Sequence, residues 1–574
     1  MSETTAQKGH PKGLWILFST EMWERFNYYG MRAILVLFMT KALMFDKAFA
    51  SSLYGGYTSL VYLTPLIGGY IADRYWGNQR SIIAGGIVMA IGEFILFFCG
   101  STFQSSPDLS AFLFFAGLGF MIAGNGFFKP NISSLVGQLY PKGDRRIDPA
   151  YTIFYMGINV GGAIGPLVCG LVGETGDPAD FKWAFLAGGI AMLLSVIVQL
   201  MFHHKYVVDS NNKILGLTPP NSPAMWLKPI FIILSLAGFS ALAIGMLYID
   251  AKVFSYLAYL LIGSAIFIFV MIMSDKNLNK YEKNRVIVLF SVVFFVIFFW
   301  SAFEQAGASL TFFADEQTDR IVDMKIPVWR IYAVFASLLL LMLWLFRKTA
   351  NNLSGDFHSR LRNTVYFVLT LFTGGIFFAV YKVYALNLSI IDFKEVPASW
   401  FQSLNSAFVV SFAPLFAWLW LKLGKYDPSA PTKMAIGLML LALGYLWIAF
   451  GVKSAGAGVK VSMIWLTGMY ALHTWGELCL SPIGLSLVNK LAPFKYASLL
   501  MAVWFLGNAF ANKLAGVLSA LYPDGKTKTF LGYEMNNNYD FFMLFVVMAG
   551  VASLILFLLT KKLQQMTHDD QQAS

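Results

Sequence analysis

The sequence predicts an all-α protein that crosses a membrane many times. Hydrophobic residues make up 57% of the chain, charged residues only 13%, and the mean hydropathy is +0.63. This composition leaves too little polar surface for a water-soluble globule. Apolar windows long enough to cross a bilayer also recur along the whole chain, between polar loops. The net charge of +11 is explained by cytoplasmic loops that face anionic lipid headgroups, so no nucleic-acid partner is expected.

The apolar windows predict sixteen membrane spans of about 20 residues each. The first six lie near 14–38, 52–72, 82–100, 110–138, 151–173 and 183–202. The other ten lie near 226–249, 254–273, 286–313, 328–346, 364–386, 398–421, 434–451, 461–488, 498–521 and 540–560. An even number of spans places both termini on one side of the membrane. Lys and Arg are more numerous in the loops on that side, which predicts cytoplasmic termini.

Two pairs of spans are expected to be accessory hairpins, and their apolar cores contain no acid. The pair at 226–273 carries charge only at its tip, Asp250 and Lys252, which is typical of a lipid-facing structural hairpin. Setting both pairs aside leaves six spans plus six, the pattern of transporters whose halves rock about a midplane site. The predicted parts are therefore a first six-helix bundle (14–202), a linker with an accessory hairpin (203–275), a second six-helix bundle (285–313 and 398–562), and a second two-helix insert (327–386).

Met1 to Pro11 is polar, and the apolar stretch after it is too long and too charged for a cleaved secretory signal, so a retained first helix is expected. The three cysteines, Cys99, Cys169 and Cys479, lie inside predicted spans. An odd number of intramembrane cysteines argues against a disulfide framework and favours packing roles.

The first span contains charges that a membrane helix does not normally tolerate. At 100° per residue, Glu21, Arg25, Tyr28 and Arg32 share one helical face, flanked by Glu24 and Tyr29. An ionised side chain at the bilayer centre costs from about 3 to more than 10 kcal/mol, so these groups must face a partner or water. The first helix is therefore expected to line a polar cavity.

Intramembrane charges elsewhere nearly balance those of the first span. Arg25, Arg32 and Lys129 stand against the acids Glu21, Glu24, Glu304 and Glu477. The excess acid can take up a proton, and breaking an ion pair would switch that acid between releasing and binding it. Glu93 and Lys513 also lie within spans; the role of Glu93 stays open, and Lys513 is expected to snorkel. His473 and Glu477 lack a third ligand, so no metal and no cofactor are predicted.

Several motifs carry a resemblance to known families. The segment 69–80, with the spacing Gly-x-x-x-Asp-Arg-x-x-Gly around Asp73 and Arg74, resembles the loop signature of the major facilitator superfamily. An acid at a helix end before a basic loop explains the same residues without a gating role. The segment 21–30 resembles the signature of the proton-dependent oligopeptide transporter family, a branch of that superfamily. Segments 154–161 and 299–305 resemble the family's fifth-helix and seventh-helix motifs, with weaker matches at 126–131 and 476–484.

This resemblance implies the major facilitator fold and a role for each candidate residue. It implies that Arg32 pairs with Glu304 across the two halves, and Lys129 with the first-helix acids or with Glu477, as gates and proton sites. Arg25 and Lys129 would attract a peptide carboxylate, Arg32 would also contact the peptide, and Glu477, Asn159 and Asn405 would receive the peptide's amino terminus. The side-chain pockets would be lined by Tyr28, Tyr29, Tyr62, Trp300 and Trp504, although Tyr62 and Trp504 are equally well explained as packing residues.

The expected function is a proton-coupled symporter that imports di- and tripeptides across a bacterial inner membrane by alternating access. Mammalian members carry a histidine in the second helix, whereas none occurs here between 51 and 80, so a carboxylate route for the proton is expected. The alternative is a carrier of the same fold for nitrate or a drug-like molecule, which the intact acids and Lys129 disfavour. No compact Ser/His/Asp cluster predicts an enzyme. A passive channel would not need charges from both halves.

Overall fold

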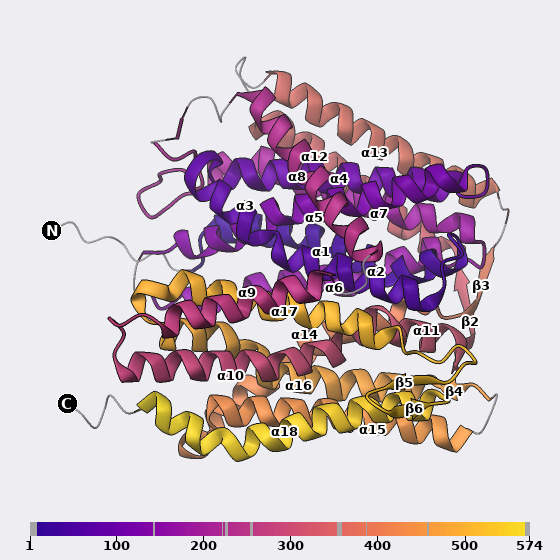
Figure 1. Ribbon diagram of the computed structural model, residues 1–574. Coiled ribbons are helices and arrows are strands. Elements are labelled where there is room, and N and C mark those ends of the chain that lie inside the picture. The colour runs from indigo at the N-terminus through magenta and orange to yellow at the C-terminus, as the bar shows by residue number, and fades with distance from the viewer. Residues whose placement is uncertain are drawn as a thin grey trace.

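The computed structural model describes residues 9–141, 144–220, 222–223, 228–252, 256–352, 359–385, 387, 389–455 and 459–568. Long helices run side by side, and α1 begins at the same end of the bundle as α18 ends (Figure 1). We call this the near end and the opposite one the far end. Twelve helices in the described part of the chain are long and apolar enough to cross a membrane. The other helices at predicted spans are shorter or more polar.

We call α1 to α7 the first helix group. It contains α1 (Lys12–Lys41), α2 (Lys47–Leu63), α3 (Pro65–Ile71), the π-helical turn η1 (Ala72–Trp76), α4 (Asn78–Thr102), α5 (Pro107–Gln138), α6 (Ile147–Gly173), the short turn η2 (Pro178–Asp180) and α7 (Phe181–Tyr206). Pro65 separates α2 from α3 within the predicted second span, since proline lacks the N–H that would continue the helix. Most residues of α1 after Thr20 are buried, so this helix forms the centre of the group.

The second helix group contains α10 (Lys280–Phe303), the 3₁₀ turn η4 (Glu304–Gly307), α11 (Ser309–Glu316), α14 (Trp400–Leu423), the 3₁₀ turn η6 (Gly424–Tyr426), α15 (Ala430–Ala455), α16 (Met463–Leu491), the 3₁₀ turn η7 (Phe494–Tyr496), α17 (Ala497–Ser519) and α18 (Asn538–His568). The predicted seventh span is thus interrupted at Glu304. The two groups approach closely where α2 crosses α17. A Cβ atom built on Gly55 would lie 2.7 Å from the Cα of Gly516, so only glycine allows this crossing.

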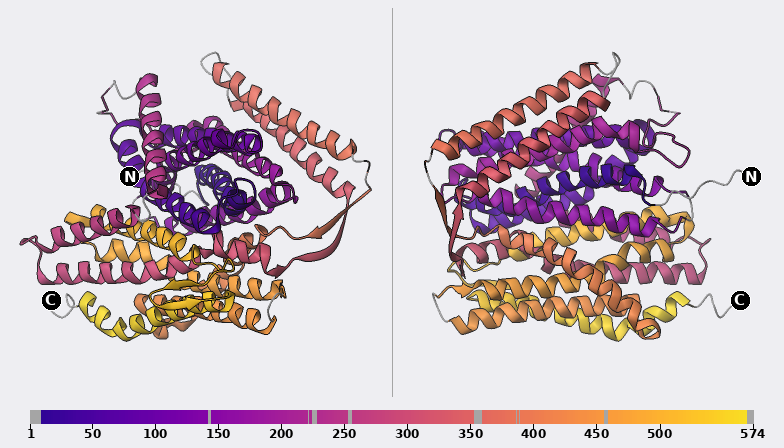
Figure 2. Two further views of the ribbon diagram at one scale, coloured as in Figure 1. Left: turned by 45° about the vertical axis from the view of Figure 1, so that its right-hand side comes forward. Right: turned by 180° about the vertical axis from the view of Figure 1, so that it is seen from behind.

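Two further helix pairs are inserted into the chain. The first pair is α8 (Pro229–Lys252) and α9 (Tyr256–Met273), and the second is α12 (Val328–Asn352) and α13 (Ser359–Ala385). The second pair stands to one side of the bundle and is joined to it by a two-stranded ribbon (Figure 2). The predicted boundaries of bundles and inserts stay predictions.

Short strands join the helices at the far end and were not predicted. The ribbon pairs β2 (Ile321–Pro327) antiparallel with β3 (Ile390–Glu395), with Pro327 opposite Ile390. The other two sheets pair β1 (Thr318–Asp319) with β4 (Val461–Ser462) and β5 (Lys528–Phe530) with β6 (Tyr533–Met535). All three lie outside the membrane-length helices, so they leave the all-α membrane class unchanged.

Candidate functional site

The charged face predicted for the first span is buried inside the protein. Glu21 and Glu24 are fully buried on α1, and Arg25 and Arg32 are only 6% exposed. Arg25 forms ion pairs with both acids, 2.6 Å from Glu24 and 3.2 Å from Glu21. Lys129 of α5 reaches the same Glu21 carboxylate. Two cations therefore balance two acids between α1 and α5.

Polar and aromatic side chains complete this cluster. Asn125 of α5 donates a hydrogen bond of 3.1 Å to Glu24. The Arg25 guanidinium lies over the rings of Tyr28 and Tyr29, at 5.1 and 5.8 Å from their centroids. Such cation–π contacts stabilise a charge that has little access to water.

A second ion pair joins the two helix groups. Arg32 of α1 lies 2.6 Å from Glu304, the first residue of η4, and both side chains are buried. The backbone comes very close at this point, because a Cβ atom on Gly307 would lie 2.9 Å from Arg32 Nε and would collide with Tyr54. The 3₁₀ turn and its glycine thus set Glu304 against the centre of α1.

The acid Glu477 of α16 lies on the other side of the centre. Asn405 of α14 donates a hydrogen bond of 2.8 Å to its carboxylate, and Tyr155 of α6 donates one of 3.4 Å. Among the described residues, no lysine or arginine forms an ion pair with Glu477. A buried carboxylate with neutral partners is a natural contact for a cation that arrives from outside.

A small cavity of about 80 Å³ lies between these groups. Seven predicted site residues line it: Tyr29, Arg32, Tyr62, Trp300, Glu304, Asn405 and Glu477. Ligand pockets usually measure about 300 to 1,000 Å³, so this structure holds the site nearly closed.

The other predicted residues lie apart from this cavity. Arg25, Tyr28 and Lys129 belong to the cluster around Glu21 and Glu24, and Asn159 donates to the backbone oxygen of Tyr155. Trp504 is buried on α17. The loop residues Asp73 and Arg74 are exposed on η1 at the near end. Lining residues that were not predicted as ligands are Phe303, Ala306, Gln402, Ser406, Tyr470 and His473.

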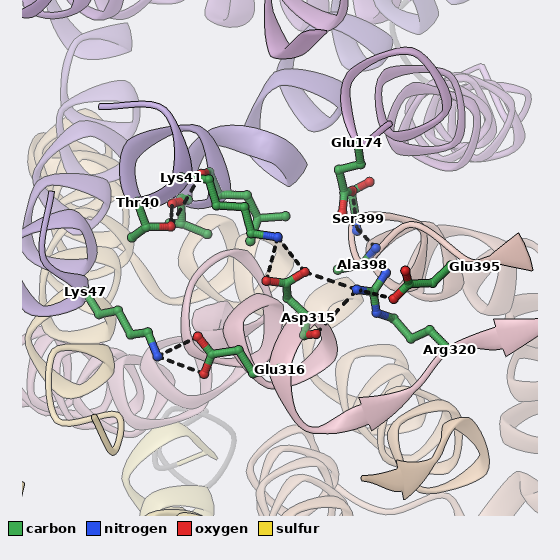
Figure 3. Close-up of polar contacts among 12 residues, drawn as sticks. Thr40, Lys41, Lys47, Glu174, Asp315, Glu316, Arg320, Glu395, Ala398 and Ser399 are labelled. Carbon is green, nitrogen blue, oxygen red and sulfur yellow. Dashed lines mark hydrogen bonds and ion pairs between the residues drawn. The ribbon is translucent and has the colours of Figure 1, made fainter. Parts of the chain in front are cut away.

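Further ion pairs join the two helix groups at the far end (Figure 3). Lys41 pairs with Asp315 at 2.7 Å, and Lys47 with Glu316 at 2.6 Å. Glu174, just after α6, accepts hydrogen bonds of 2.9 Å from the backbone N–H groups of Ala398 and Ser399 before α14. Burial raises the pKa of Glu174, and these hydrogen bonds oppose that rise. The described contacts therefore hold the far end closed.

A bundle of membrane-length helices with opposite charges from two groups facing a central cavity is the architecture of a membrane carrier. The family comparison agrees: the POT family model (PTR2) matches residues 79–388 and 361–532. This chain belongs to the POT family, whose members have the major facilitator fold.

Relatives and solved structures match over nearly the whole chain. The uncharacterized transporter YclF of Bacillus subtilis is 33% identical over 90% of this chain and 88% of its own length. The peptide transporter YePEPT of Yersinia enterocolitica is 32% identical over 89% of this chain and 88% of its own length. A di-/tripeptide transporter of Lactococcus lactis is 29% identical over 98% of this chain and 97% of its own length. A crystal structure of a POT family transporter with 5-aminolevulinic acid has a TM-score of 0.72 and 27% identity, covering 97% of this chain and 98% of its own.

Proposed function

We propose that this chain is a proton-coupled symporter that imports di- and tripeptides, with both termini in the cytoplasm of a bacterial cell. The observation that carries the proposal is the buried Arg32–Glu304 pair, because it joins the two helix groups beside the cavity. The names of the Yersinia and Lactococcus relatives support peptides as the substrate class.

The Arg32–Glu304 pair provides a way to couple a proton to movement. An ionised Glu304 holds Arg32, and so holds α1 against the start of η4. A proton on Glu304 removes its charge and most of the attraction, which frees the two helix groups to separate. A proton that moves inward gains about 2.3 kcal/mol per 100 mV of membrane potential, so its movement can drive accumulation of a zwitterion.

The cavity offers charges of both signs to a short peptide. Glu477, with Asn405 beside it, is suited to the peptide's amino terminus because no described cation neutralises it. The carboxylate of the peptide would be attracted by Arg25 and Lys129. In this structure the charges of these two residues are paired with Glu21 and Glu24. Tyr29, Tyr62 and Trp300 supply aromatic walls that tolerate varied side chains.

The test is uptake of a labelled dialanine peptide into proteoliposomes that contain the protein. We expect accumulation that needs an inward proton gradient, stops with an uncoupler and is competed by other di- and tripeptides. Absence of uptake of any short peptide would contradict the substrate assignment. Labelled nitrate and a drug-like molecule in the same vesicles test the alternative of another substrate on this fold.

Glu304→Gln tests the coupling step separately. We expect this variant to lose gradient-driven accumulation but to keep exchange of peptide across the membrane, since the neutral amide resembles a protonated acid. Glu316→Gln is the matched control, because Glu316 also pairs with a cation across the groups but lies outside the cavity. Uphill uptake at the wild-type rate in Glu304→Gln would refute this role.

A further inference from the structure

The first inserted pair is divided between the two helix groups. Helix α8 packs on α5, where the rings of Phe239 and Phe127 lie 5.3 Å apart and a Cβ on Gly119 would collide with Ile244. Helix α9 packs on α17 and α10 instead, with the rings of Phe269 and Phe290 4.9 Å apart. The two helices touch each other only slightly. They therefore connect the two groups across the edge formed by α2 and α17.

The tip of this pair contains a fully buried ion pair. Asp250, near the end of α8, lies 2.6 Å from the amino group of Lys513 on α17, and the two residues are 2% and 1% exposed. The second carboxylate oxygen accepts a hydrogen bond of 3.1 Å from the backbone N–H of Leu257 in α9. One side chain thus joins α8, α9 and α17. This differs from the lipid-facing tip and the snorkelling lysine expected from the sequence.

The pair lies beside the crossing of α2 and α17. A Cβ atom on Gly56 of α2 would lie 2.5 Å from Asp250 Oδ2, so the carboxylate rests against the backbone of α2. The adjacent residue, Gly55, makes the close approach to Gly516 of α17. Both contacts lie towards the far end, because α8 and α17 run towards it (Figure 1). Asp250 therefore lies in contact with both α2 and α17, where the two groups meet.

We propose that Asp250 and Lys513 form an intramembrane lock that keeps α2 and α17 together at the far end and that opens when the far end opens. The link to transport rests on the proposed function; the lock itself rests on these contacts. Because α8 packs on the first group and Lys513 lies on the second, we expect separation of the groups to draw Asp250 away from both Lys513 and the N–H of Leu257. While the edge is closed, each of these buried charges has the other as its partner, so removing one of them leaves an uncompensated charge in the closed form.

The test measures the separation of the two groups at the far end. Spin labels on cysteines at Ser101 and Ile464, which are exposed on α4 and α16, report this distance by pulsed electron resonance in nanodiscs. In Asp250→Asn and in Lys513→Met we expect the population with the longer distance to rise by about tenfold or more, as when a buried pair loses a partner. The exchanged pair Asp250→Lys with Lys513→Asp should restore the closed distribution.

A second variant keeps the test valid where a single substitution prevents folding. Asp250→Asn combined with Lys513→Met removes the lock without leaving a buried charge alone, and it should also shift the population towards the longer distance. Asp524→Asn with Lys528→Met is the matched control, because it removes a partly exposed aspartate–lysine pair between the end of α17 and the start of β5.

A distance distribution equal to that of the wild type in the folded double variant would overturn the lock and leave only a structural pair. The measurement needs no substrate. A protein without peptide uptake would therefore refute the proposed function, while the distances would still decide the lock.

Discussion

The two inserted helix pairs look alike in the sequence, yet they are attached in different ways. The first pair, α8–α9, contacts both helix groups and buries the Asp250–Lys513 pair between them. The second pair, α12–α13, rests mainly on α7 through a small cluster around Phe202, Met342 and Leu345. Much of α12 is exposed, as expected for a lipid-facing helix. The contact between Asp250 and Lys513 thus makes α8–α9 a connection between the two helix groups, whereas α12–α13 is peripheral.

The second pair is anchored mainly at the base of its ribbon. Arg320 pairs with Asp315 at 3.1 Å and with Glu395 of β3 at 2.8 Å, and it also donates to the backbone oxygen of Val396 (Figure 3). Asp315 in turn binds Lys41 of α1. The polar attachment therefore lies outside the membrane-length helices, and of its charged groups Glu395 is the one that is largely exposed.

The largest expected effect comes from reversing the charge of Asp250. Asp250→Lys would bury two cations side by side, and breaking a buried pair costs about 3 to 5 kcal/mol before their repulsion is added. We expect little folded protein in detergent and a marked fall of the unfolding temperature, with recovery when Lys513→Asp is added. An unchanged unfolding temperature in the single variant would show that the first insert is as peripheral as the second.

A smaller effect is expected at the base of the ribbon. Arg320→Gln removes two ion pairs, but Asp315 keeps Lys41 and Glu395 is largely exposed. The free energy of unfolding should fall by about 2 kcal/mol, which is the usual contribution of a hydrogen bond to a charged group. Thermal unfolding measures it, and Lys394→Gln on the neighbouring exposed position is the control. A loss as large as that of Asp250→Lys would remove the contrast between the inserts.

We expect Glu174, which lies near the same end of the β2–β3 ribbon, to make the stability of the protein depend on pH. Its pKa is raised by burial above the ordinary value of 4.5, so its stabilising contribution is full below 4.5 and is lost as pH rises through the raised value. Compared with Glu174→Gln, the wild type should therefore lose stability as pH increases across this window. The difference between the two unfolding temperatures should vanish below 4.5; a constant difference at all pH values would contradict the raised pKa.

The smallest effect on transport is expected from removing the second insert. Pro327 and Ile390 are paired across the ribbon, so an Asn-Gly turn can replace residues 328–389 and close the hairpin. Peptide uptake should stay within about twofold of the wild type, because the cluster on α7 is small beside the main core. Loss of uptake in a folded deletion variant would give α12–α13 a role in the cycle.

Much of the helical fold and the charged face of α1 could be predicted from local patterns, whereas Tyr62, Trp300 and Asn405 of the cavity were expected only from the family resemblance. Helix periodicity alone placed Glu21, Arg25 and Arg32 on one face, and the structure buries all of them. The approach of Glu304 to Arg32 came only from the family resemblance, since periodicity within one helix says nothing of a residue in the other half of the chain.

Other features could not be predicted because their signals are weak or distant. A lone lysine in an apolar span, such as Lys513, is expected to snorkel. Nothing near it in the sequence indicates that its partner is Asp250, at the tip of another helix pair. His473 was considered only as a metal ligand, although it lines the cavity and packs 4.7 Å from the ring of Tyr445. Gln402 and Ser406 are neutral and follow no motif. Such residues can be identified as part of the site only from their position in the folded structure.

The small size of the central cavity has a consequence for the energy supply of the cell. A single water needs about 10 to 15 Å³ of such space, so about 80 Å³ admits only a few molecules. The few waters that this described cavity could hold do not by themselves form a continuous column from one membrane face to the other. We therefore expect the proposed symporter not to conduct ions passively in this state, so that the proton gradient is kept while the carrier waits for cargo.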